Sequence, residues 1–170
     1  MDWLETHQNL VVGIFGFIGV ISTIWANAYI ARKQRREERE HEQRTVRSAL
    51  LAELQINMDS LKTNARTLTE KPPLETGAVF VPTDPMDGAF RSFLPKIGLL
   101  SEDEVNKVMN AYMSLQTYNT NLGLIGSPGH TIPRGVSVPA RHATTLRGLQ
   151  ESMLKPVEEA VRALEARRRT

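Results

Sequence analysis

The sequence has no cysteine, and no lysine or arginine occurs before Arg32. The missing cysteines exclude a disulfide framework, thiolate zinc sites and a cysteine nucleophile. Between Glu5 and Arg32 there is no charged residue of either sign, whereas all 21 Lys+Arg residues follow that gap. The chain is therefore divided into an uncharged N-terminal part and a long charged remainder.

The sequence also lacks the usual motifs of catalysis. The four histidines, at 7, 41, 130 and 142, form no pair at metal-ligand spacing on one element. The glycine-rich stretch 123–140 has no phosphate-loop pattern, and neither a nucleophile elbow nor a dinucleotide fingerprint is present. Helix capping accounts for the acidic run Glu102–Glu104 better than metal binding does. We therefore expect no catalytic, cofactor-binding or metal site, and no enzyme.

The uncharged part contains a long apolar run from Leu10 to Ile30. It has the approximately 20 residues that a transmembrane helix needs and, at about 1.5 Å per residue, covers roughly 32 Å. A cleaved signal peptide is the alternative, because 26–28 reads Ala-Asn-Ala. The N-terminus lacks the positive charge of a signal peptide, however, and the run is too long for one. We predict a transmembrane helix over 10–31.

The flanking charges predict the orientation of this helix. Lysine and arginine beside a transmembrane end are retained on the cytoplasmic side. Residues 1–9 are thus expected outside the cell, in an inner-membrane protein whose C-terminal domain is cytoplasmic. Trp25 and Tyr29 would lie near the inner interface, and Trp3 near the outer one. The net charge of +2 does not indicate nucleic acid as a partner.

Residues 32–45 are predicted to form a charged helical stalk. They contain no proline or glycine, and opposite charges four residues apart, such as Lys33 and Glu37, favour a solvated helix. The bilayer is one expected partner. Contact with anionic lipid is expected through the basic residues that follow the apolar run, namely Arg32, Lys33, Arg35 and Arg36.

Residues 46–170 are predicted to form a cytoplasmic domain of about three amphipathic helices. Their apolar residues recur at spacings of three and four. The first helix carries Val46, Leu50, Leu54, Met58 (or Asn57), Leu61, Ala65 and Leu68. The second begins at a capping box, Ser101 with Glu104, and carries Val105, Val108, Tyr112, Leu115, Asn119 and Leu122. The third carries Leu146, Leu149, Met153, Val157, Val161 and Leu164.

Prolines predict interruptions between and within these helices. The segments 71–88 and 123–140 are rich in proline and glycine and are expected to be long loops, either functional or merely flexible. Val79–Val81 is expected to be a short extended piece that packs on the bundle. Pro156 lies inside the last helix, where we expect a kink or a restart.

The fold class predicted is thus all-α, with a single transmembrane helix, a stalk, and a helical bundle or coiled coil. The function expected is a non-enzymatic module that binds an unknown protein partner or forms a homo-oligomer at the inner face of the membrane. Small residues on one face of the transmembrane helix, namely Gly16, Gly19, Ser22, Thr23 and Ala26, favour self-association. The alternative is a lysis or envelope-spanning element, with the helical part on the outer side of the membrane.

Overall fold

The computed structural model describes residues 2–70, 78–82, 85–125, 127–128, 135–139 and 142–167 of the 170-residue chain. For residues 2–16 it describes the course of the backbone alone. The chain divides into two compact units, Met1–Glu42 and Gln43–Thr170. Each unit is described by itself below, although the helix α1 (Asp2–Glu70) contributes residues to both.

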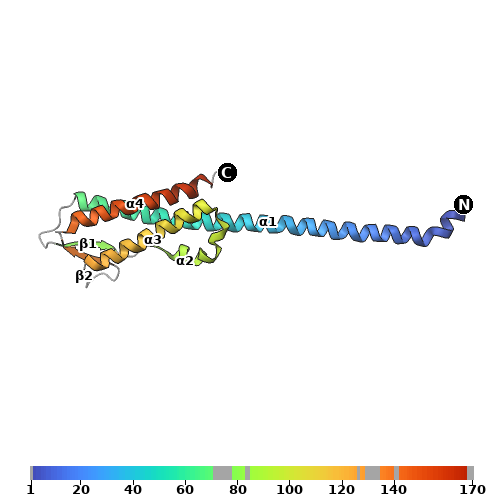
Figure 1. Cartoon of the computed structure of the whole chain (residues 1–170), viewed down its shortest axis with the longest axis horizontal. Helices are drawn as coiled ribbons and strands as arrows, with labels where there is room; N and C mark the ends of the chain where they lie inside the picture. Colours follow the sequence, from blue (N-terminus) through green and yellow to red (C-terminus); the bar gives the residue numbers. More distant parts are fainter. Residues whose placement is uncertain are drawn as a thin grey trace. The chain divides into compact units, whose positions relative to one another are not determined.

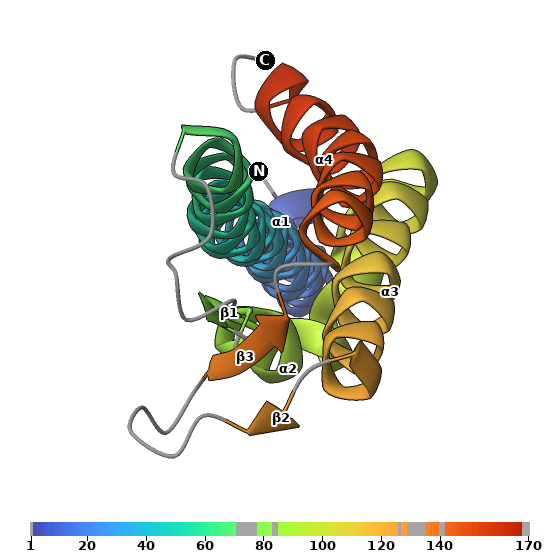
Figure 2. The ribbon, with the colours of Figure 1, turned by 90° about the vertical axis from the view of Figure 1, so that its left-hand side faces the viewer.

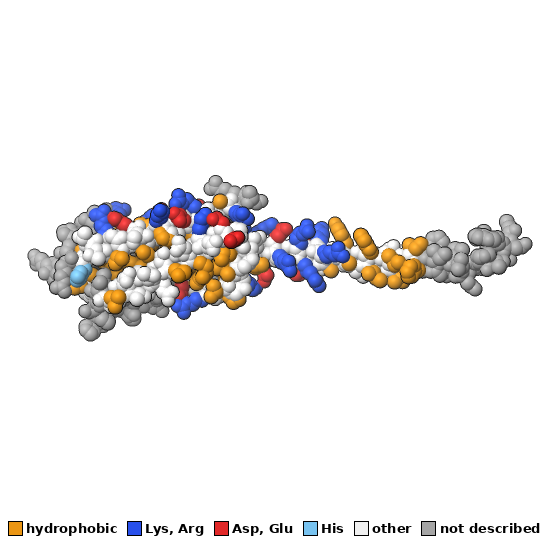
Figure 3. Space-filling view, in the orientation of Figure 1, with side chains coloured by type: hydrophobic (Ala, Val, Ile, Leu, Met, Phe, Trp, Pro, Cys, Tyr) orange, Lys and Arg blue, Asp and Glu red, His pale blue; other side chains and the backbone are white. Residues whose placement is uncertain are grey.

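The first unit is helical, as the sequence predicts for residues 10–45. In its described part the apolar side chains are exposed, and Trp25 is 76% exposed. Figure 3 shows such side chains gathered on this segment and followed by basic ones. The exposed large apolar residues here are Phe17, Ile18, Val20, Ile21, Ile24, Trp25, Tyr29 and Ile30.

The sequence also predicts that residues 10–31 of this helix span a membrane. Among the described residues, no helix is both long enough and apolar enough to cross a membrane. The side chains of residues 10–16, which begin the predicted span, lie outside the described set. The structure therefore establishes the helix but does not support its predicted role in the bilayer.

The second unit is predominantly helical, as predicted, with a small sheet at one side (Figure 1). After the last part of α1 come the strand β1 (Ala78–Pro82), the short helix α2 (Gly88–Phe93) and the 3-10 helix η1 (Leu94–Leu99). The long helix α3 (Glu102–Ile125) follows, and then the strands β2 (Ser127–Pro128) and β3 (Gly135–Pro139). The helix α4 (Ala143–Ala166) completes the unit.

Polar contacts define how the long helices run. Arg47 and Glu53 of α1 contact Glu104 and Tyr112 of α3, so these two helices run in the same direction. Going along α1, Gln55 contacts Glu165 and Lys62 contacts Glu158, so α4 runs in the opposite direction. In the end-on view, α1, α3 and α4 stand at three corners of the bundle, and the sheet lies below α1 (Figure 2).

One cluster of buried apolar side chains joins these elements. Most members were predicted from the helical spacing, and the two buried strand residues, Val81 and Val138, extend the cluster beneath the sheet. Val105, Leu149 and Met153 are only partly buried, whereas Ala111, Tyr118 and Ala160 join the core without having been predicted. The cluster consists of Val46, Leu50, Leu51, Leu54, Leu61, Val81, Leu100, Val108, Ala111, Tyr112, Leu115, Tyr118, Leu122, Val138, Leu146, Val157, Ala160, Val161 and Leu164.

The predominantly helical structure is consistent with the all-α prediction, and a small three-stranded sheet adds to it. β3 pairs with both β1 and β2 in antiparallel fashion, in the order β1-β3-β2, and Val79 lies opposite Val138. The two segments predicted as loops, 71–88 and 123–140, supply these strands. In β3, Val136 and Val138 alternate with Gly135, Ser137 and Pro139, whereas every residue of β1 is apolar. Successive residues of a strand point to opposite faces, and the buried Val81 and Val138 lie on the face that meets the core. The extended piece at Val79–Val81 was predicted, but its partner strand was not.

Two predicted helix features had different outcomes. The capping box is confirmed, because Ser101 N and Oγ donate to Glu104 Oε2 at 2.9 and 2.8 Å. Of the kink or restart predicted at Pro156, the restart is wrong, because α4 continues through that residue, and the kink stays a prediction. Proline removes one N–H donor from a helix, and the buried residues Val157 and Val161 hold the next turn against the core.

Candidate functional site

A segment made of residues 85–94 is held against α1 by two buried polar side chains. Asn57 donates from Nδ2 to the Met86 carbonyl at 2.8 Å and accepts from the Met86 N–H at 2.9 Å. Glu53 accepts from the N–H groups of Ala89 and Phe90 at 2.6 and 3.0 Å. This carboxylate binds the N-terminus of α2, where Asp87 makes no side-chain cap.

Glu53 also receives a hydrogen bond from α3. The Tyr112 hydroxyl donates to Glu53 Oε1 at 2.5 Å, and the Tyr112 ring stacks on Phe90 with centroids 4.0 Å apart. Burial raises the pKa of Tyr112, and the hydrogen bond to Glu53 raises it further. The hydroxyl therefore stays protonated and keeps donating at neutral pH. Together these contacts fix the distance between α2 and α3.

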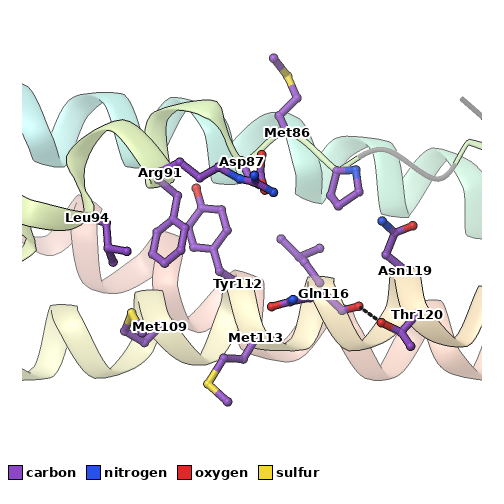
Figure 4. A pocket seen from close by; sticks show the side chains of 13 residues that line it. Met86, Asp87, Arg91, Leu94, Met109, Tyr112, Met113, Gln116, Asn119 and Thr120 are labelled. Atoms are coloured by element: carbon purple, nitrogen blue, oxygen red, sulfur yellow. Dashed lines mark hydrogen bonds and ion pairs between the residues drawn. The ribbon is translucent and has the colours of Figure 1, made fainter.

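A groove lies between segment 85–94 and α3 (Figure 4). Its volume is about 580 Å³, and we call it the methionine groove. Met86 and Met113 lie at its two edges, 52% and 62% exposed, and Leu94 is 44% exposed. The lining consists of Pro85, Met86, Asp87, Phe90, Arg91, Leu94, Met109, Tyr112, Met113, Leu115, Gln116, Asn119 and Thr120.

The polar groups of the methionine groove are largely satisfied within it. Arg91 pairs with Asp87 at 2.6 Å, and Thr120 donates to the Gln116 carbonyl at 3.0 Å. Tyr112 is held by Glu53 as described above. Flexible, polarisable methionine side chains adapt to varied apolar partners. The arrangement is therefore suited to receiving apolar side chains.

At the start of α3, Glu104 forms a buried ion pair with Arg47 of α1. Arg47 Nε lies 2.7 Å from Glu104 Oε1, and the two side chains are 9% and 1% exposed. Burial by itself would raise the pKa of Glu104, but hydrogen bonds from Arg47 and Ser101 outweigh it and hold that pKa below its usual value. Asp103, another residue of the acidic run, pairs with the exposed Lys107 at 2.9 Å. Within the described residues, no group of three potential ligands is placed to hold a metal ion.

The basic residues predicted to contact lipid are all exposed on the first unit. Lys33 lies 3.9 Å from Glu37, the weak pair that the sequence predicts. On the same unit, Thr23 Oγ1 donates to the Gly19 carbonyl at 2.9 Å. That hydroxyl is therefore satisfied within its own helix, and the prediction of self-association through the small-residue face stays a prediction.

Sequence reasoning missed the buried charges Arg47 and Glu53, and with them the methionine groove. A helical projection contains the missing signal for Glu53. At 100° per residue, Glu53 falls about 20° from Val46, within the same arc as the apolar positions. The groove itself has no such signal, because it forms between segments that no periodicity relates. Comparison with known proteins adds no constraint: no family model, curated protein or solved structure matches the chain.

Proposed function

We propose that this protein is a non-enzymatic, single-pass membrane protein that presents a helical interaction module at the inner face of the membrane. One observation carries the proposal: the helix from Phe17 to Ile30 has large apolar side chains exposed around it, and exposed basic residues follow directly. Continuous exposed apolar surface of this kind marks a membrane or protein contact. The uncharged run from Leu10 and the basic residues after it favour a membrane, with the N-terminus outside.

The second unit supports the interaction part of the proposal. It has its own buried core, so its surface is not needed to complete the fold. The methionine groove then offers an exposed apolar surface on a rigid support. Along α3, the groove is lined at 109, 112, 113, 115, 116, 119 and 120, one face of this helix that extends over about three turns and can receive an amphipathic helix laid alongside. We propose such a helix, from a protein partner, as the occupant of the groove.

Cysteine labelling tests the anchor and its orientation. The cysteine-free chain permits single substitutions, Thr6→Cys before the apolar run and Thr120→Cys in the second unit. An impermeant thiol reagent is expected to label Thr6→Cys in intact cells and Thr120→Cys only after lysis. The reverse pattern would reverse the orientation and favour the lysis or envelope-spanning alternative. Recovery of the protein in the soluble fraction after the membranes are sedimented would refute the membrane anchor itself.

Site-specific photo-cross-linking tests the interaction module. A photoreactive residue at Met113, at the edge of the groove, is expected to give discrete cross-linked products in intact cells. The same residue at Ser152, an exposed position on α4, is the matched control and should give none. Cross-links to one partner peptide with a helical spacing of contacts would support the proposal. Equal products from both positions, or none from either, would refute the groove as the contact surface.

A further inference from the structure

All four arginines of the first unit lie on one side of the helix. At 100° per residue, Arg32, Arg35, Arg36 and Arg39 fall within an arc of about 100°, and we call this set the arginine face. Lys33 lies about 100° from Arg32, outside the arc, beside its partner Glu37. Glu37 and Glu38 project more than about 100° from the centre of the arc, whereas Glu40 and Glu42 flank its two sides. The positive charge of this segment is therefore concentrated on one face.

The arginine face is available to a ligand. All four side chains are exposed. Within the described part of the chain, none of them forms a hydrogen bond or an ion pair, in contrast to Lys33. Each guanidinium has five N–H donors in a planar fork that matches the oxygens of a phosphate. Adjacent turns of one face bring several such forks to a single anionic group.

The position of the face relative to the apolar run identifies the ligand. Arg32 follows Ile30 by two residues, about 3 Å along the axis, and Arg36 by about 9 Å. The headgroup layer on each side of the hydrocarbon core is about 5–8 Å thick. Side chains on a helix lean toward its N-terminus, so these arginines lean back toward the run. The guanidinium groups of Arg32, Arg35 and Arg36 then reach the level of lipid phosphates, and that of Arg39, about 14 Å beyond Ile30 along the axis, reaches the aqueous side of the headgroup layer.

We propose that the arginine face binds the headgroup of an anionic phospholipid at the inner leaflet. This inference rests on the proposed membrane anchor. It changes the set of lipid contacts expected from the sequence, because Arg39 joins the site and Lys33 leaves it. A basic residue near an anionic surface contributes about 1 kcal/mol, which corresponds to about fivefold in relative affinity for each arginine engaged.

Quenching of Trp25 by brominated lipid measures this affinity in the full-length chain. The Trp3→Phe background leaves Trp25 as the only tryptophan. The protein is reconstituted into vesicles of phosphatidylcholine and phosphatidylglycerol, with bromine on the acyl chains of one lipid or the other. The ratio of the two quenching curves gives the preference for the anionic lipid. The wild-type face is expected to prefer phosphatidylglycerol at least fivefold.

Two variants separate a binding face from general positive charge. The double variant Arg35→Gln/Arg36→Gln should lower the preference for phosphatidylglycerol by up to about 25-fold, which removes it where the wild-type preference is smaller than that. The exchange Arg36→Glu/Glu37→Arg keeps the net charge and depth but moves one charge off the face, and should lower the preference at least fivefold. Lys33→Gln is the matched control and should change it less than twofold.

The outcomes distinguish this inference from the proposed anchor. A chain that does not insert into pure phosphatidylcholine vesicles would refute the anchor. A chain that inserts but is quenched equally by both brominated lipids would refute the lipid site alone, and would leave the arginine face to an acidic protein surface. An exchange variant that retains the full wild-type preference would show that net charge suffices and would overturn a binding face.

Discussion

The buried ion pair between Arg47 and Glu104 permits a sharp test of what burial contributes to an ion pair. A second pair in the same unit, Arg147 with Glu151, has the same Nε–Oε1 distance of 2.7 Å, and Arg47 also donates from Nη2 to Glu104 Oε2 at 3.3 Å. The two pairs differ in exposure. The side chains of the first pair are 9% and 1% exposed, and those of the second are 49% and 53% exposed. The perturbation is Arg→Met at each arginine, which keeps much of the apolar stem.

The expected destabilisation differs greatly between the two variants. Arg47→Met leaves the Glu104 carboxylate buried with one partner removed, and breaking a buried pair in this way costs about 3–5 kcal/mol. The hydrogen bonds that Ser101 donates to Glu104 remain, so the cost should lie near the lower end of this range. Arg147→Met breaks an exposed pair four residues apart on one helix, which costs about 0.3–0.5 kcal/mol after solvent screening. The difference should therefore be about 3 kcal/mol.

Urea unfolding followed by far-ultraviolet circular dichroism measures both values in a fragment of residues 43–170. The midpoint should fall strongly for Arg47→Met and hardly at all for Arg147→Met, with the slope of the transition unchanged. The double variant Arg47→Met/Glu104→Gln should recover part of the loss, because the uncompensated charge is gone. Equal losses from the two single variants would refute the reasoning, since burial would then make no difference.

Three further outcomes are expected from the same fragment. Residues 43–170 should melt cooperatively, because they form a compact unit with one core; a broad thermal transition would mean that the helices need a partner. Leu115→Ala should cost about 2–5 kcal/mol, whereas Met113→Ala at the exposed edge of the groove should cost under about 0.5 kcal/mol; similar urea midpoints would contradict the assigned burial. Because the pKa of Glu104 is lowered from 4.5, its contribution is present above about pH 4.5 and is lost as pH falls through the folded value. A pH series should show this loss in the wild type and less of it in Arg47→Met.

The long helices of the second unit were predictable because their signal is local. Residues such as Val108, Leu115 and Leu122 recur at the helical period, and a helix turns such residues to one side whatever it packs against. Ser101 and Glu104 are three residues apart, so the capping box also needs no distant partner. Each of these features depends on residues within a few helical turns of one another, so a single sequence is enough to predict it.

The sheet and the groove were not predictable, because their signals are distributed. Val79 meets Val138 across nearly sixty residues, and strands of five residues separated by that distance show no shared period. The sequence contains only a weak sign that Glu53 is buried, namely its position on the apolar side of α1. Burying an unpaired carboxylate is costly, so this sign alone does not predict burial. Only its three donors, from Ala89, Phe90 and Tyr112, make the burial favourable.

Because buried polar residues of α1 hold the methionine groove in place, we expect its exposed side chains to tolerate substitution without unfolding of the unit. Glu53 and Asn57 bind backbone groups of segment 85–94, and backbone groups are present whatever side chains the segment carries. Met86 and Met113 point outward from this support, so changing them alters the edges of the groove and leaves its frame in place. Changing Glu53 would instead leave two N–H groups of α2 and the Tyr112 hydroxyl without their acceptor, a loss of about 1–3 kcal/mol for each group that stays buried. The side chains expected to contact a partner, Met86 and Met113, are therefore different from those that hold the groove in position, Glu53 and Asn57.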